Sequence, residues 1–140
     1  MKSITFTVKG VQGKARPRAS FVHGHAVIYT PKKTKEFEDR IAKGYIEDGG
    51  TMFDKDVPVK VSVLIFHGVP KSLSKKKRDE LLDQLTRPMK KPDGDNVLKC
   101  VMDALNGVAY ADDSQVVEFD ARKFWAADDY LIVTVSDASL

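Results

Sequence analysis

The sequence predicts a single α+β domain in which helices pack against a mixed β-sheet. Strand-like alternation of polar and apolar side chains occurs near both ends and in the middle of the chain, and helix-like spacing of apolar side chains separates these segments. The expected order is strand, hairpin, helix, strand, short helix, helix, strand, strand. The length of 140 residues and the apolar fraction of 42% suit one core, so the domain is expected to span residues 1–140.

The N-terminal part of the chain is expected to form a strand, a hairpin and a long helix. Residues 3–8 alternate as in a strand with one buried face, and residues 21–29 suggest a hairpin. His23-Gly24-His25 lies at its turn, and we interpret the two histidines as turn residues because no third soft ligand is nearby. Thr30 suits the N-cap and Pro31 the first position of a helix that continues to about residue 47. Its buried face is expected to consist of Phe37, Ile41 and Tyr45.

The remaining elements are predicted from the same two patterns. Residues 57–67 become apolar on both faces towards their end, which is typical of a central strand. Ser74 is expected to cap a short helix over residues 75–82, and a second helix ends at Asn106-Gly107. Two final strands, residues 115–123 and 130–135, are separated by so few residues that they predict a hairpin.

Acidic side chains are concentrated between residues 90 and 117. Asp93 or Asp95 can cap the helix that follows, which contributes about 1 kcal/mol, but a cap needs only one carboxylate. Asp103 lies two turns beyond Asp95 on the same edge of that helix, and Asp112-Asp113 precedes the next strand. At least three of these carboxylates could therefore converge.

Converging carboxylates repel one another, so a cluster of them usually implies a cation. Aspartate oxygens suit Mg²⁺ or Mn²⁺, which are commonly held by a few carboxylates together with water and phosphate oxygens. The alternative is a set of solvated acids around a capped helix. The spacing alone does not decide between the two.

Cations flank the acidic segment at three places, which are residues 9–18, residues 32–35 and residues 75–91. Residues 9–18 carry four cations and no acid, which favours phosphate contact. Cations in the first turn of the helix after Pro31 oppose the helix macrodipole and so suggest an external anion. The alternative in each case is a solvated surface. The candidate DNA-binding residues are Lys14, Arg16, Arg18, Lys32, Lys33, Lys75, Lys76, Lys77, Arg78, Lys90 and Lys91.

The overall composition restricts the class of protein. The net charge of +3 is mild but unevenly distributed. Cys100 is the only cysteine, which excludes an internal disulfide and a cysteine-based metal site. No stretch resembles a signal peptide or a membrane span, so a cytoplasmic protein without membrane contact is expected.

An acidic centre within a basic surface favours metal-dependent phosphodiester cleavage. Carboxylates alone repel phosphate, whereas a divalent ion can bridge the two and activate water. Lys99, one turn beyond Asp95, could stabilise charge that develops on the scissile phosphate or orient the attacking water.

Several segments also form an ordered series of motifs, which are Lys91-Pro92-Asp93-Gly94-Asp95-Asn96, Lys99, Asp103-Ala104-Leu105-Asn106-Gly107 and Asp112-Asp113-Ser114-Gln115-Val116. This series resembles the signature of one known family, the RusA-type Holliday junction resolvases. Residues 14–18, 29–34 and 70–75 are similar to segments of its phage and Gram-positive branch. The resemblance thus extends over nearly the whole chain, and the ordered series of motifs is specific.

The resemblance implies a RusA-like fold and a Mg²⁺-dependent homodimer, with Mn²⁺ as a substitute, that cuts four-way DNA junctions by paired symmetric nicks. A two-fold substrate suits such a two-fold protein. The roles implied position by position are Asp93, Asp95 and Asp113 as metal-binding catalytic acids, Lys99 as the catalytic lysine, Asp112 as a further metal ligand, and Asp103 and Asn96 as supporting residues.

Two alternatives stay open. A broader flap or branched-DNA nuclease would treat four-way DNA as one substrate among several. A non-catalytic nucleic-acid-binding protein would use the acids to hold a structural divalent ion. A calcium site of the EF-hand type is disfavoured because its ligand spacing and terminal glutamate are missing.

Overall fold

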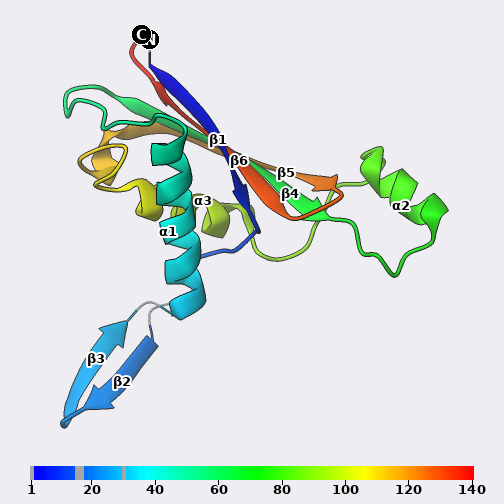
Figure 1. Ribbon diagram of the computed structural model, residues 1–140, viewed down its shortest axis with the longest axis horizontal. Helices are drawn as coiled ribbons and strands as arrows, with labels where there is room; N and C mark the ends of the chain where they lie inside the picture. Colours follow the sequence, from blue (N-terminus) through cyan, green and yellow to red (C-terminus); the bar gives the residue numbers. More distant parts are fainter. Residues whose placement is uncertain (1, 15–17, 30) are drawn as a thin grey trace.

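The computed structural model describes residues 2–14, 18–29 and 31–140, and only the backbone of Arg18. It confirms the α+β prediction, with a four-stranded mixed sheet, a separate two-stranded sheet and, within the described residues, three α-helices (Figure 1). The elements are β1 (Ser3–Lys9), β2 (Arg18–Val22), β3 (His25–Tyr29), α1 (Lys32–Glu47), β4 (Val59–Gly68), α2 (Lys75–Leu82), α3 (Gly94–Leu105), the 3₁₀ turn η1 (Asp113–Gln115), β5 (Val116–Ala126) and β6 (Tyr130–Asp137).

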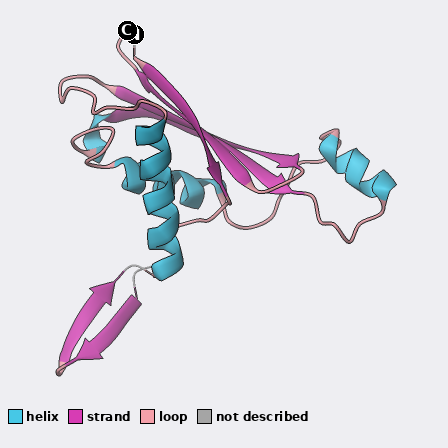
Figure 2. Cartoon of the chain, in the orientation of Figure 1, coloured by secondary structure: helices cyan, strands magenta, loops and turns pink. Residues whose placement is uncertain are grey.

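The main sheet has the strand order β1-β6-β4-β5 (Figure 2). β6 pairs antiparallel with both of its neighbours, whereas β4 and β5 run parallel. β4 is central, as its apolar sequence predicts. Its alternate side chains face the helices and are fully buried because strand residues two apart share a face. These side chains are Val59, Val61, Val63 and Ile65.

The predicted hairpin between the last two strands is wrong. β5 and β6 are not neighbours, because β4 lies between them and pairs with both. The chain passes from β5 to β6 around the end of β4, where the amide of Gly68 donates to Oδ1 of Asp129 at 2.6 Å. A Cβ at position 68 would lie 3.3 Å from the Asp128 backbone, so glycine permits this close passage.

Helices α1 and α3 cover one face of the sheet, and α2 lies beyond the end at which β4 and β5 finish (Figure 1). The predicted buried face of α1 is confirmed, because Phe37, Ile41 and Tyr45 are fully buried. α3 buries Val97 and Val101 in the same core. The two helices lie side by side on this face and contact each other.

The helix ends agree in part with prediction. The predicted cap of α2 is confirmed, since Oγ of Ser74 accepts from the Lys77 amide at 3.2 Å. α1 ends before Gly49, which has a φ of +87°. Thr30, the predicted cap of α1, lies outside the described residues. Among the helices described, none is long and apolar enough to cross a membrane.

The predicted hairpin is confirmed as the two-stranded sheet of β2 and β3. His23 and Gly24 form its turn with positive φ values of 52° and 78°, the conformation that two-residue hairpin turns require. Figure 2 shows that the hairpin projects from the start of α1, away from the main sheet.

Candidate active site

Asp93 and Asp95 lie at the beginning of α3, and both side chains are exposed. Asp93 occupies the N-cap position with φ −63° and ψ 146°, but its carboxylate makes no capping hydrogen bond. The structure therefore does not show Asp93 acting as a side-chain cap of α3. A helix start favours negative charge electrostatically, so both carboxylates lie where the helix macrodipole is favourable to them.

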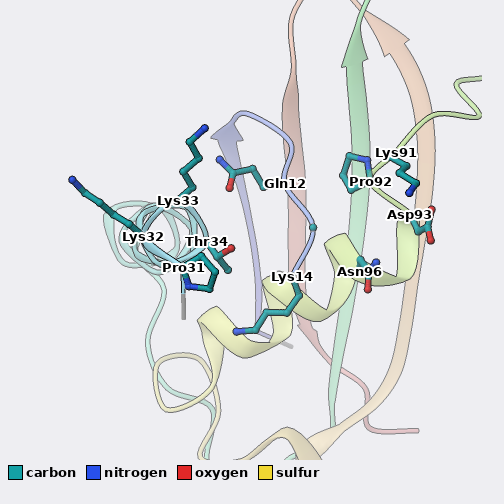
Figure 3. A pocket seen from close by; sticks show the side chains of 11 residues that line it. Gln12, Lys14, Pro31, Lys32, Lys33, Thr34, Lys91, Pro92, Asp93 and Asn96 are labelled. Carbon is teal, nitrogen blue, oxygen red and sulfur yellow. The ribbon is translucent and has the colours of Figure 1, made fainter. Parts of the chain in front are cut away.

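The start of α3 faces a cleft of about 820 Å³ whose opposite wall is the start of α1 (Figure 3). Lys32 and Lys33 come from α1, and Lys91, Asp93 and Asn96 from the α3 side. The cleft is thus lined by lysines on the α1 wall and by an aspartate on the α3 wall.

The segment after β1 forms the floor of the cleft and is held against α3. The amide of Lys14 donates to the carbonyl of Asn96 at 3.0 Å. A Cβ on Gly13 would lie 3.0 Å from Cβ of Pro92 and 3.1 Å from Cβ of Asn96. A larger residue would force Pro92 and Asn96 to shift by a few tenths of an ångström, so glycine suits this close packing on α3.

Lys14 links three elements through its ammonium group. Nζ lies 3.1 Å from Oε1 of Glu38 on α1 and 3.2 Å from Oδ2 of Asp103 on α3. All three side chains are largely buried, with exposed fractions of 18%, 14% and 28%. Burial alone lowers the pKa of Lys14, but the two ion pairs outweigh it and the pKa is raised.

Asp113 lies in the 3₁₀ turn before β5, with Asp103 and Asp112 as its charged neighbours. Burial, the charge of Asp103 and the charge of Asp112 together raise the pKa of the Asp113 carboxyl. Asp112 differs, because hydrogen bonds from the hydroxyl and amide of Ser114 lower its pKa. Asp113 is therefore ionised against an unfavourable local field, whereas Asp112 organises the turn.

The acids predicted to share one ion do not form one cluster. Asp103, which was predicted only as a supporting residue, lies two turns beyond Asp95 on α3, or about 12 Å along its axis. Lys99 lies between them and is exposed. Across residues 2–14, 18–29 and 31–140, no group of three or more His, Cys, Asp or Glu side chains is spaced to hold a metal ion. The predicted three-carboxylate site of Asp93, Asp95 and Asp113 is not assembled in this structure.

Asp93 and Asp95 nevertheless fit Mg²⁺, which is usually bound by one or two carboxylates and completed by water and phosphate oxygens. The Asp93 carboxylate is available for this role because it does not cap its helix. Cys100 does not suit a metal, since burial raises its pKa to about 12 and keeps the thiol protonated.

The family model for the endodeoxyribonuclease RusA matches residues 10–136. The chain belongs to the RusA family. It is also 36% identical over 142 residues to the uncharacterized protein YqaN of Bacillus subtilis (strain 168), a match that covers 99% of both chains. The resemblance inferred from the motifs is thus confirmed, and the family is one of nucleases that act on DNA.

In this RusA-family chain the predicted basic surface divides into two regions. Lys32, Lys33 and Lys91 line the cleft. The cations of α2 lie at the other end of the sheet, where Lys75 and Arg78 line a separate hollow (Figure 1). Arg16 lies outside the described residues, and the side chain of Arg18 is not described. Their DNA contacts stay predictions, as do those of Lys76, Lys77 and Lys90.

Two positioning residues of the RusA fold were not predicted. Lys123 on β5 donates through Nζ to the carbonyls of Lys90 (2.5 Å) and Pro92 (3.0 Å), directly before Asp93. Gln115 donates to the carbonyl of Asp54 at 3.1 Å and so holds the turn that carries Asp113. Strand alternation could have revealed Lys123, because it shares the helix-covered face of β5 with Ala121 and Trp125.

Proposed function

We propose that this RusA-family protein is a Mg²⁺-dependent, structure-selective endodeoxyribonuclease that resolves four-way DNA junctions by paired nicks as a homodimer. The observation that carries the proposal is a single cleft lined by Asp93, whose carboxylate is not used for helix capping, and by Lys32 and Lys33. A carboxylate in a phosphate-binding cleft weakens binding unless a cation accompanies it. The cleft therefore suits the cutting of a DNA strand better than simple binding.

Asp93 and Asp95 are the proposed core of the metal site. A bound Mg²⁺ would supply Lewis-acid activation of the phosphate and a hydroxide nucleophile at neutral pH. Asp113 remains a proposed catalytic acid and metal ligand, because keeping it ionised beside Asp103 and Asp112 opposes folding and is typical of a functional site. Asp112 orients this turn through Ser114 and is proposed as an additional ligand.

The lysines have different proposed tasks. Lys32, Lys33 and Lys91 bind phosphates on the walls of the cleft. Lys14 is already neutralised by Glu38 and Asp103, so its main task is to fix the floor of the cleft against α3. Lys99 is exposed on α3 and is proposed to stabilise negative charge in the transition state.

The decisive experiment compares the wild-type protein with Asp93→Asn on an immobile four-way junction. We expect the wild type to make paired nicks with Mg²⁺ and none in EDTA. Asp93→Asn should bind the junction as well or better, because a charge that repels phosphate is gone, while cleavage falls by orders of magnitude. Asp79→Asn, an exposed carboxylate on α2, is the matched control and should cut normally.

The outcomes separate the alternatives. Equal cleavage of junctions, forks, flaps and linear duplex would favour the broader branched-DNA nuclease. Normal cleavage by Asp93→Asn would mean that Asp93 is not catalytic and at most holds a structural ion. Cleavage that persists after every divalent ion has been removed would contradict the proposed mechanism.

A further inference from the structure

The hairpin of β2 and β3 is not supported by the core of the protein. Its strands pair only with each other, and it projects from the start of α1 (Figures 1 and 2). Every side chain described from residue 19 to residue 29 is exposed. An isolated two-stranded hairpin is at best marginally stable in water. Packing within this chain therefore does not explain the apolar residues that the hairpin carries.

One face of the hairpin consists entirely of apolar side chains. Ala19 pairs with Ile28 and Phe21 with Ala26, and residues that are directly opposite in a pair share a face. Phe21 is 82% exposed and Ile28 is 75% exposed. Phe21 is the most exposed aromatic side chain in the described part of the chain. The opposite face is mixed and includes polar groups such as that of Ser20.

The charge around the hairpin restricts what can cover this apolar face. Residues 1–35 contain eight lysines and arginines and no aspartate or glutamate. The chain that leaves the hairpin continues into Pro31, Lys32 and Lys33, which line the catalytic cleft. Lys14, Lys32 and Lys35 pair with Glu38, Glu36 and Asp39, whereas Lys33 has no ion pair among the described residues. A second copy on this face would bring its own Lys33 and the same acid-free segment in a two-fold arrangement, so like charges would meet. The surroundings favour a polyanion that also presents flat apolar groups.

Nucleic acid meets both conditions where its bases are unstacked. In a linear duplex the flat faces of the bases are covered by their neighbours, whereas at a branch point bases are unpaired at lower cost. Aromatic side chains stack on exposed bases with little dependence on sequence. Phosphates of the same strand could then enter the adjacent lysine-lined cleft.

We propose that the apolar face of the β2–β3 hairpin, and Phe21 above all, stacks on an unpaired base at the branch point of the DNA. This inference rests on the proposed function and deepens it, because it assigns the preference for branched over linear DNA to a defined surface. The cleft binds phosphate in any DNA, whereas the hairpin recognises the branch.

The test measures binding by the full-length protein in Ca²⁺, which replaces Mg²⁺ to prevent cutting. One probe is a four-way junction with a fluorescent adenine analogue at the branch point, and the other is a linear duplex with the sequence of one arm. We expect Phe21→Ala to lower junction affinity about tenfold, to leave duplex affinity unchanged, and to abolish the fluorescence change that the wild type causes. Phe21→Trp should restore both. Val27→Ala, on the opposite face of the same strand pair, is the control and should behave as the wild type.

Other outcomes would overturn the inference. Equal loss of affinity for both DNAs would make Phe21 a general DNA contact. A change in the mass of Phe21→Ala by light scattering would show that the face binds a second copy. Wild-type behaviour of Phe21→Ala on a junction that the wild type prefers and cuts would defeat this inference alone. If the wild type neither prefers nor cuts the junction, the proposed function fails first.

Discussion

Adjacent carboxylates at the end of the acidic segment have opposite surroundings. Asp112 accepts hydrogen bonds from Ser114, and these lower its pKa. Partial burial and the negative charges of Asp103 and Asp112 raise the pKa of Asp113. Ionised Asp112 therefore stabilises the folded state, whereas ionised Asp113 destabilises it. This contrast is typical of a functional acid beside a structural one.

The contrast predicts opposite effects of two substitutions on stability. The pKa of Asp113 is raised above 3.8 in the folded state, so its favourable contribution is complete below that pH and is lost as the pH rises through the folded pKa. Asp113→Asn should therefore stabilise the metal-free protein at neutral pH by a few tenths of a kcal/mol after solvent screening, and not at acidic pH. Urea unfolding at both pH values measures this.

Asp112→Ala is the comparison. The pKa of the Asp112 carboxyl is lowered in the folded state. The stability that this carboxylate contributes is therefore present above pH 3.8 and is lost as the pH falls through the folded pKa. The alanine variant should be less stable than the wild type at neutral pH. If Asp113→Asn instead loses as much stability as Asp112→Ala, Asp113 is a structural residue and its catalytic assignment is wrong.

At the scale of elements, β5 holds the segment that delivers Asp93. The side-chain amide of Gln84 donates to the carbonyl of Trp125 at 2.8 Å, and its oxygen accepts from the Trp125 amide at 3.0 Å. Nε of Arg87 donates to the carbonyl of Lys123 at 3.0 Å. With Lys123 bound to the last carbonyls before Asp93, the segment after α2 follows the edge of β5. The edge strand thus positions Asp93, the proposed catalytic acid.

This positioning predicts the effect of Lys123→Gln. The shorter amide should release the carbonyls of Lys90 and Pro92, so that Asp93 is less well placed. We expect kcat for junction cleavage to fall about ten- to a hundredfold, while junction affinity and the unfolding midpoint change little. Single-turnover cleavage and equilibrium binding measure the two effects separately.

Arg122→Gln is the control for Lys123, since it removes the neighbouring exposed cation on the other face of β5. It should leave kcat unchanged. An equal loss in both variants would indicate a general charge effect rather than positioning of the segment before Asp93.

At the scale of the whole molecule, the candidate DNA-binding lysines and arginines whose side chains are described lie mainly at two distant places. One group lines the cleft beside the hairpin, and the other lies on α2 at the far end of the sheet (Figure 1). A short duplex cannot reach both, whereas a junction with long arms can. DNA length should therefore separate their contributions.

The salt dependence of binding tests this division. Each lysine that contacts a phosphate contributes about 0.9 to the slope of log affinity against log salt. Removing both Lys32 and Lys33 should lower the slope by about 2 on short and long-armed junctions alike. Removing both Lys76 and Lys77 should lower it only on long arms. An effect of the α2 pair on the shortest junction would contradict the arrangement.

Local patterns in the sequence determine the strand and helix segments, the buried face of α1, the Ser74 cap and the turn at His23-Gly24. They suffice because each depends on spacing within one element. The ordered acidic motifs also identify the family, since they keep their order along the chain whatever the fold does.

Only the tertiary structure decided the strand order, the engagement of Lys14 and the distribution of the acids along α3. Lys14 was predicted to bind DNA, yet its ammonium lies between Glu38 and Asp103 from two different helices. β5 was predicted to pair with its successor, yet β4 lies between them. These arrangements depend on contacts between residues far apart in the sequence, and such contacts leave no periodic pattern within any single segment.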